Sequence, residues 1–215
     1  MEHHEDPVGR QRLPEGVEIL VFDVGETLVD ETRMWTDHAR EIGATPFTLM
    51  AALGSLIERG RDHREVWSVL GTGRPVRPFV PCLSDLYPDA LDCLRAARIA
   101  GMRIGIAANQ PAGVVDRLAD LGIETDLTVS SHDLGVAKPD PEFFAALTRR
   151  AGAEAGRILY VGDRLDNDIL PARAAGMRTA FLRRGPWALI QSRSDAPGAD
   201  LVLDSLDQLT RILTA

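Results

Sequence analysis

The sequence predicts an α/β fold in which a parallel sheet is covered by helices on both faces. Short apolar runs, each about the length of a strand, recur along the chain and suit strands that are buried on both faces. Segments with helical apolar spacing separate these runs, and such alternation is typical of a parallel sheet. One long stretch after the first run contains helical segments but no convincing strand. Together these observations predict a Rossmann-like sheet with a small α-helical cap inserted after its first strand.

Six apolar runs are the expected strands. The first of them, VEILVF, is almost continuously apolar and ends directly before Asp23. The six runs span residues 17–22, 103–108, 127–129, 157–161, 178–182 and 201–203.

Helical spacing marks the segments between the runs. It predicts helices over residues 34–42, 47–57, 63–70, 89–100 and 168–175, with others after Pro111 and around Phe143. Residues 71–81 are rich in Gly and Pro and are expected to form a connecting loop. We therefore expect a flexible tail (1–15), a Rossmann-like core (16–30 and 82–215) and an α-helical cap (31–81).

Composition and charge narrow the classes of partner. The net charge of −8 predicts an acidic surface, which repels nucleic-acid phosphates and anionic lipids. Cys82 and Cys93 lack the spacing of a disulfide framework or a metal site, so two reduced thiols are expected. No apolar run suits a signal peptide or a membrane helix. We therefore expect a cytoplasmic protein that binds a small molecule, without a nucleic-acid or membrane partner; the sequence does not predict an oligomeric state.

Polar side chains follow the expected strands at the points where the strands end. Asp23 follows the first strand, Asn109 the second and Asp163 the fourth; Asp168 comes shortly after, and Lys138 precedes the fourth strand. Singly, such an Asp often caps the next helix, and a Lys before Pro is usually a solvated loop residue. In open α/β sheets, however, ligands bind outside these strand ends. Several carboxylates gathered there are costly in repulsion and desolvation unless a cation or an anionic ligand joins them.

The residue types suggest a chemistry for such a site. A carboxylate can attack phosphorus or carbon to form a mixed anhydride or an ester, and Asp23 is the best-placed candidate. Asp23 and Asp163 offer oxygen ligands for a hard cation such as Mg²⁺. Lys138 would offset the negative charge and hold the substrate oxyanion. Thr27 and Asn109 could donate hydrogen bonds to the transferring group.

Four motifs together resemble those of the haloacid dehalogenase-like hydrolase superfamily, over residues 17–182. They are Asp23-Val24-Gly25-Glu26-Thr27, Ala108-Asn109, Lys138-Pro139-Asp140-Pro141, and Gly162-Asp163 followed by Asp168. The resemblance implies a hydrolase with Asp23 as the covalent nucleophile and residues 31–81 as the family's small helical cap. It also implies Mg²⁺ held by Asp23, Asp163 and the Gly25 carbonyl, with Asp168 as a further ligand directly or through water.

Two positions depart from the family pattern. Gly25 stands where the phosphatases carry a second Asp, which acts as the general acid and then as the base. Ala108 stands where they carry Ser or Thr, so one hydrogen bond to phosphate is missing. Loss of a positioned acid/base typically costs about 10²–10⁴-fold in rate. Glu26 is a candidate substitute, although a solvated carboxylate at a helix start is the preferred interpretation of it.

Three functions are compatible with these motifs. The first is a Mg²⁺-dependent phosphatase of a small phosphorylated metabolite. The second is a metal-independent 2-haloacid dehalogenase, which Gly25 permits but the intact Gly162-Asp163 disfavours. The third is a binding or regulatory member of the family that has lost turnover, as Gly25 and Ala108 permit. Substrate identity is not predicted. The candidates for lining an anion pocket, or alternatively for forming a helical surface, are the cap residues Arg33, Trp35, His38, Arg40, Arg61, His63, Arg64 and Trp67.

Overall fold

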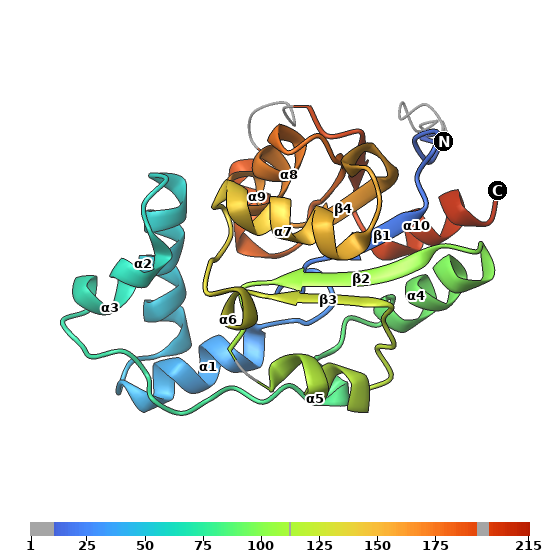
Figure 1. The fold of residues 1–215 in the computed structure, drawn as a ribbon. Coiled ribbons are helices and arrows are strands. Elements are labelled where there is room, and N and C mark those ends of the chain that lie inside the picture. The colour runs from blue at the N-terminus through green and yellow to red at the C-terminus, as the bar shows by residue number, and fades with distance from the viewer. Residues whose placement is uncertain (1–10, 112, 193–197) are drawn as a thin grey trace, which may run out of the picture.

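A computed structural model describes residues 11–111, 113–192 and 198–215 and contains one parallel sheet (Figure 1). Within these residues the sheet has six strands in the order β3-β2-β1-β4-β5-β6. The strands are β1 (Ile19–Phe22), β2 (Arg103–Ala108), β3 (Leu127–Ser130), β4 (Ile158–Gly162), β5 (Arg178–Leu182) and β6 (Leu201–Leu203). The predicted α/β class and all six predicted strands are confirmed, with ends that differ by at most two residues. The strand order reverses at β1, which lies between β2 and β4.

Alternate side chains of β1 enter two different cores. Leu20 and Phe22 belong to the core that also contains residues of α4 (Ala90–Ile99) and α10 (Leu206–Leu213). Ile19 and Val21 belong to the core that contains residues of α7 (Pro141–Ala151) and α8 (Leu170–Ala174). In Figure 1 α7 and α8 lie on one side of the sheet, and α4 and α5 (Val114–Asp120) lie on the other. Both faces of the sheet are therefore covered, which explains why its strands are continuously apolar.

The segment after β1 is helical, as predicted. It contains α1 (Thr32–Glu41), α2 (Pro46–Glu58), the short helix η1 (His63–Glu65) and α3 (Val66–Val69). These helices stand to one side of the sheet in Figure 1. They share an apolar cluster built around Trp35, Leu49, Leu53 and Trp67, which also takes in Trp187 from α9 (Gly185–Gln191). The division into core and cap stays a prediction.

The first ten residues of the predicted tail lie outside the described part of the chain. From Gln11 onward the chain contacts the core. The Gln11 amide donates to the Val202 carbonyl at 2.7 Å and accepts from the Val202 amide at 2.8 Å, and Leu13 packs against apolar core residues.

Several helices are absent from the sequence prediction. They are η2 (Leu83–Asp85), α6 (Ser131–Leu134), η3 (Ala155–Arg157), α9 and α10. The helix expected over residues 168–175 begins earlier, as a wide turn η4 (Leu165–Ile169) that continues into α8. Cys82 and Cys93 are free thiols, as predicted. Among the described residues, no helix combines the length and the apolar character needed to cross a bilayer.

Arg33 of α1 holds the returning chain against the helical segment. Its Nε donates to Asp85 Oδ1 at 2.8 Å, its Nη2 donates to the Val80 carbonyl at 2.9 Å, and its guanidinium lies 4.6 Å above the Phe79 ring. Asp85 is buried, and its hydrogen bond from Arg33 lowers its pKa from 3.8 to about 2. This bidentate ion pair between Arg33 and Asp85 therefore stabilises the connection between α1 and α4.

We expect Asp85→Asn to reduce the free energy of unfolding at neutral pH by about 1–2 kcal/mol, less than the full pKa shift implies because Arg33 is partly open to water. The folded pKa is depressed, so this stabilisation is present above pH 3.8 and is lost as the pH falls toward 2. Urea unfolding of both proteins across this range tests it. Asp92→Asn, which breaks an exposed pair with Arg95, is the control and should change stability by less than about 1 kcal/mol. A pH-independent difference for Asp85→Asn would contradict the assignment.

Candidate active site

The predicted polar residues meet at the strand ends next to the switch point of the sheet. Asp23 follows β1 and Asp163 follows β4, and these strands are paired with Phe22 opposite Val161. Gly162 is required here, because a Cβ atom at this position would lie 2.7 Å from the Cβ of Asp168. The Gly162-Asp163 pair therefore lets the Asp168 side chain pack directly over the end of β4.

Lys138 is the centre of the site. Its buried Nζ donates to Asp23 Oδ1 at 2.7 Å, to Asp168 Oδ1 at 2.6 Å and to the Tyr160 hydroxyl at 2.9 Å. The Tyr160 hydroxyl in turn donates to the Ala107 carbonyl at 2.7 Å. Burial alone would lower the pKa of Lys138, but the charges of Asp168 and Asp23 outweigh it and raise the pKa well above its usual value. The side chain is therefore a fixed cation at neutral pH.

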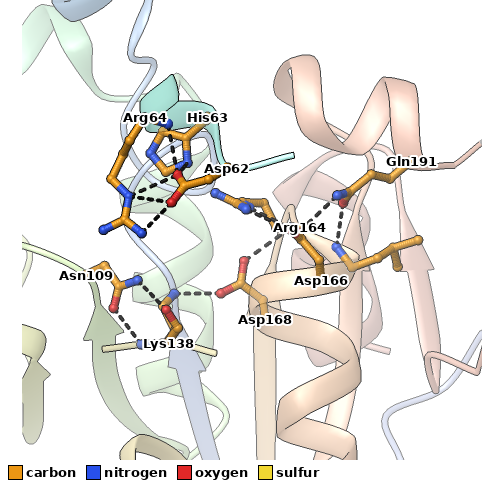
Figure 2. A network of polar contacts seen from close by, with 10 residues as sticks. Asp62, His63, Arg64, Asn109, Lys138, Arg164, Asp166, Asp168 and Gln191 are labelled. Atoms are coloured by element: carbon orange, nitrogen blue, oxygen red, sulfur yellow. Dashed lines mark hydrogen bonds and ion pairs between the residues drawn. The ribbon is translucent and has the colours of Figure 1, made fainter. Parts of the chain in front are cut away.

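Asn109 positions the backbone of Lys138 (Figure 2). Its Nδ2 donates to the Lys138 carbonyl at 2.9 Å, and its Oδ1 accepts from the Lys138 amide at 2.8 Å. The side chain also lines the cavity above the carboxylates. Its predicted role as a donor to the transferring group is untested; the contacts it makes are those of a residue that orients Lys138.

Three carboxylates gather at this site, and two of them, Asp23 and Asp168, bind Lys138 directly. Oxygen atoms of Asp23, Asp163 and Asp168 all lie within 4.8 Å of one another, and all three residues are buried. Burial, with the charges of Asp168 and Asp23, raises the pKa of Asp163 well above its usual value. Burial also raises the pKa of Asp168 to about 6, although Lys138 acts in the opposite direction. One ammonium does not balance three carboxylates, so the cluster favours a further cation or protonation.

The residues present fit a divalent metal ion. Asp163 Oδ2 is buried and has no hydrogen-bond partner among the described residues. Asp168 is already engaged, because its Oδ1 accepts from Lys138 and its Oδ2 accepts from the Arg164 amide at 3.2 Å. Asp163 and Asp23 are therefore the better direct ligands, and Asp168 suits a supporting position. An oxygen-only donor set of this kind is the one that Mg²⁺ prefers.

Glu26 and Thr27 of the first motif are both buried. Glu26 is 6% exposed, so the expectation of a solvated carboxylate is wrong. Its Oε2 accepts from the Tyr87 hydroxyl at 2.6 Å, and its Oε1 accepts from the Glu31 amide at 3.0 Å. Thr27 is fully buried, its hydroxyl has no hydrogen-bond partner among the described residues, and it is not among the residues that line the cavity. Its role as a hydrogen-bond donor to substrate stays a prediction.

Glu31 fills the space beside Gly25. A Cβ atom built on Gly25 would lie 2.8 Å from Glu31 Cδ and closer still to Oε1. Burial, together with the charges of Glu26 and Asp23, raises the pKa of Glu31 to about 8. Glu31 lines the same cavity as Asp23 and Lys138.

The cavity above the carboxylates has a volume of about 430 Å³. Five of the predicted cap residues line it, namely Trp35, His38, His63, Arg64 and Trp67. Arg33 and Arg40 line a separate cavity beside α1, and Arg61 pairs with Glu65. Burial and the Arg164 charge lower the pKa of His63 to about 4, so it is neutral at neutral pH.

The sequence analysis missed several residues of the site. Among them, Tyr160 lies inside a strand, Glu31 at the end of a loop and Arg164 in a turn, and Trp187 lies on a helix that was not predicted. Arg164 pairs with Asp166 at 2.7 Å, and its guanidinium lies 4.9 Å above the Trp187 ring (Figure 2 shows Arg164 opposite His63). The only available signals were a Tyr within an aliphatic strand and Arg164 directly after Gly162-Asp163.

Comparison with known proteins identifies the family. A model of haloacid dehalogenase-like hydrolases matches residues 17–176. The chain belongs to the haloacid dehalogenase-like hydrolase family. The resemblance inferred from the four motifs is thus confirmed for this family.

Several relatives with similar sequences are named phosphatases. Glyceraldehyde 3-phosphate phosphatase of Methanopyrus kandleri is 34% identical over 130 residues, which cover 59% of this chain and 56% of that protein. This chain therefore spans little more than half the length of the Methanopyrus protein. Phosphoglycolate phosphatase 1 of Pseudomonas aeruginosa is 29% identical over 231 aligned positions, covering 95% of this chain and 81% of that protein.

Solved structures of other proteins share the fold of this chain. The L-2-haloacid dehalogenase of Xanthobacter autotrophicus is 22% identical, with a TM-score of 0.63 over 93% of this chain and 99% of that chain. At this identity the likeness concerns the fold alone. It does not distinguish a phosphate ester from a haloacid as the substrate, so the chemistry has to be argued from the site.

We expect Asp163→Asn to melt at a higher temperature than the wild type in chelated buffer, because it removes a buried carboxylate that has no partner. The folded pKa of Asp163 is raised, so the wild type loses stability as the pH rises above 3.8 and the advantage of the variant grows. Mg²⁺ at one hundred times its Kd should stabilise the wild type by about 2.7 kcal/mol and the variant far less.

Thermal melts with and without Mg²⁺ measure both effects. Asp116→Asn, at an exposed position of α5, is the control and should respond to Mg²⁺ as the wild type does. Equal stabilisation of Asp163→Asn by Mg²⁺ would exclude Asp163 as a ligand.

Proposed function

We propose that this protein is a Mg²⁺-dependent phosphatase of a small phosphorylated metabolite, with Asp23 as the covalent nucleophile. The observation that carries the proposal is the buried cluster of Asp23, Asp163 and Asp168 around the single ammonium of Lys138. The phosphatase names of the relatives support the same reaction class. A cytoplasmic location remains part of the proposal.

The charge of the cluster favours phosphate over haloacid chemistry. A metal-independent dehalogenase needs a nucleophilic carboxylate and a cation, which Asp23 and Lys138 would already provide. It has no use for a second buried carboxylate without a hydrogen-bond partner, and Asp163 supplies one. A metal ion held by Asp23 and Asp163 would compensate that charge and would supply Lewis-acid stabilisation to a phosphate ester.

In this proposal Asp23 attacks the phosphorus of the substrate. Its Oδ1 is held by Lys138 at 2.7 Å, which leaves Oδ2 as the nucleophilic oxygen. Attack forms a bond from Oδ2 to phosphorus as the bond from phosphorus to the alcohol oxygen breaks, giving an aspartyl phosphate and an alkoxide that takes up a proton to become the alcohol. Attack by water on phosphorus then releases phosphate and restores the carboxylate.

Lys138 and Mg²⁺ would both stabilise the negative charge that develops on the phosphoryl group. Lys138 lies beside the nucleophile as a fixed cation and needs no reorganisation as charge develops on the phosphoryl oxygens. Mg²⁺, held by Asp23, Asp163 and the Gly25 carbonyl, would supply Lewis-acid stabilisation of that same charge. Ala108 offers no hydroxyl, so these two cations carry the larger share of phosphate binding.

The cavity suits a small anionic substrate. Its volume of about 430 Å³ leaves room for a metabolite rather than a polymer. Arg64, Arg74 and Arg164 line it, and Trp35, Trp67 and Trp187 contribute its apolar surface. This combination favours a compact phosphate ester with a short polar or anionic remainder.

A turnover screen over phosphorylated metabolites, with and without Mg²⁺, tests the proposal. We expect phosphate release that requires Mg²⁺ and is abolished in Asp23→Asn, because an amide is a poor nucleophile. Circular dichroism should show that the variant is folded. Asp140→Asn is the control, since Asp140 caps α7 by accepting from the Glu142 amide at 2.9 Å and Asn caps equally well; it should retain activity.

The alternatives give different results in the same experiment. Metal-independent release of halide from a 2-haloacid, lost in Asp23→Asn, would establish the dehalogenase instead. Mg²⁺ binding without turnover of either substrate class would establish the non-catalytic role. An Asp23→Asn variant with undiminished phosphate release would exclude Asp23 as the nucleophile.

A further inference from the structure

Gly25 leaves the first motif without a carboxyl at the position beside the nucleophile, but the structure does not leave that position empty. The carboxyl group of Glu31 occupies it, with Cδ 2.8 Å from the point where a Cβ of residue 25 would lie. Because that separation is shorter than a real contact between carbon atoms, a side chain at residue 25 would require the Glu31 carboxyl to shift from its present position. Glu31 therefore stands in the place of a residue-25 side chain in space, though six residues further along the chain.

A tight loop brings Glu31 back to this place. After β1 the amides of Leu28 and Val29 both donate to the Val24 carbonyl at 2.9 Å, and the Glu26 amide donates to the Val29 carbonyl at 2.7 Å. Glu26 takes a left-handed backbone conformation, with φ of 52°, which is uncommon for a residue with a side chain. The chain thus turns back so that Glu31 faces Gly25.

Glu26 fixes the end of this loop. Its carboxylate accepts from the Glu31 amide at 3.0 Å and from the Tyr87 hydroxyl at 2.6 Å. Gly185 packs so closely against it that a Cβ there would lie 2.6 Å from Oε2. Glu26 and Glu31 both line the cavity. Both Glu26 oxygens are engaged in hydrogen bonds, which makes Glu26 a positioning residue and Glu31 the better candidate for proton transfer.

We propose that Glu31 is the general acid and base of the reaction, in place of a carboxyl at residue 25. In the first step Asp23 forms a bond to phosphorus while the alcohol oxygen leaves. Glu31 donates its proton to that leaving oxygen. In the second step Glu31, now a carboxylate, takes a proton from the water that attacks the aspartyl phosphate. The proton that leaves in one step is regained in the other, so the cycle balances. This inference rests on the proposed phosphatase function.

The leaving group separates proton transfer from every other role of Glu31. An aryl phosphate such as 4-nitrophenyl phosphate has a good leaving group and needs little protonation, whereas ethyl phosphate needs a proton. The ratio kcat/KM reports the steps up to phosphoryl transfer. We expect Glu31→Gln to lower kcat/KM for ethyl phosphate by about 10²–10⁴-fold and for 4-nitrophenyl phosphate by less than about tenfold. A general loss of structure would lower both alike.

The second step supplies an independent readout. Glu31→Gln lacks the base for water, so the aspartyl phosphate should accumulate when the aryl ester is used. Rapid mixing should then show a burst of about one 4-nitrophenol per protein followed by slow turnover. A structural role alone would produce no burst.

A carboxyl supplied from residue 25 should restore the activity that is lost when the Glu31 carboxyl is removed. Glu31→Ala vacates the space beside residue 25, and Gly25→Asp in that background places a carboxyl there from the other side. We expect Glu31→Ala/Gly25→Asp to recover at least about tenfold of the ethyl phosphate rate that Glu31→Ala loses. Gly25→Asp alone should give no gain, because Glu31 already occupies the space. Glu58→Gln, the same substitution at an exposed end of α2, is the control and should leave both substrates unchanged.

The outcomes distinguish the two proposals. If Glu31→Gln lowers both esters equally, or neither, and shows no burst, Glu31 is not the acid and base while the phosphatase function stands. If the wild type releases phosphate from neither ester nor from any metabolite in the screen, both proposals fail. Loss confined to ethyl phosphate, with a burst and with rescue from residue 25, is the result that supports Glu31.

Discussion

The buried ammonium of Lys138 is the contact on which the arrangement of the site depends. Three carboxylates end within 4.8 Å of one another beside it, at strand ends where water is largely excluded. Without that cation the carboxylates would repel one another or take up protons. Much of the surrounding sequence serves to hold it: Asn109 fixes its backbone, Tyr160 accepts from its Nζ, and Gly162 leaves room for Asp168 to reach it. The loop that carries Lys138 and the end of β4 are thus joined by charge rather than by apolar packing.

The first motif shows how a local loss can be met by a different part of the chain. Gly25 removes a carboxyl, and the space is filled by Glu31 through a loop that relies on one residue with a positive φ. Glu26, Tyr87 and Gly185 come from three separate segments and meet at the end of that loop. Their shared effect is to hold the Glu26 carboxylate, which in turn binds the backbone amide of Glu31.

The sheet and the charged centre could be predicted from the sequence, because both depend on short runs of neighbouring residues. Apolar runs mark strands buried on both faces, and parallel strands bring Asp23 and Asp163 to one edge wherever they end. The sequence was not sufficient for Glu26, Glu31 or Trp187. Burial of Glu26 depends on Tyr87 and Gly185, and the place of Glu31 depends on the absence of a side chain at Gly25; neither follows from spacing along the chain. The helix that carries Trp187 is only seven residues long and has too few turns for a periodic signal.

Trp187 links the two parts of the molecule that border the cavity. Its indole is 6% exposed and lies 6.2 Å from that of Trp35, within the apolar cluster of α1 to α3, yet it belongs to α9 beyond the sheet. A hinge that swung those helices outward as one rigid body would expose this side chain at a cost of roughly 1.5–3 kcal/mol. The rest of α9 is held to the sheet part, because Ala188 lies in a buried cluster with Phe181 and Gln191 is hydrogen-bonded to Leu165 and Asp166. Trp187 therefore resists any opening of the cavity in which α1 to α3 move away from α9.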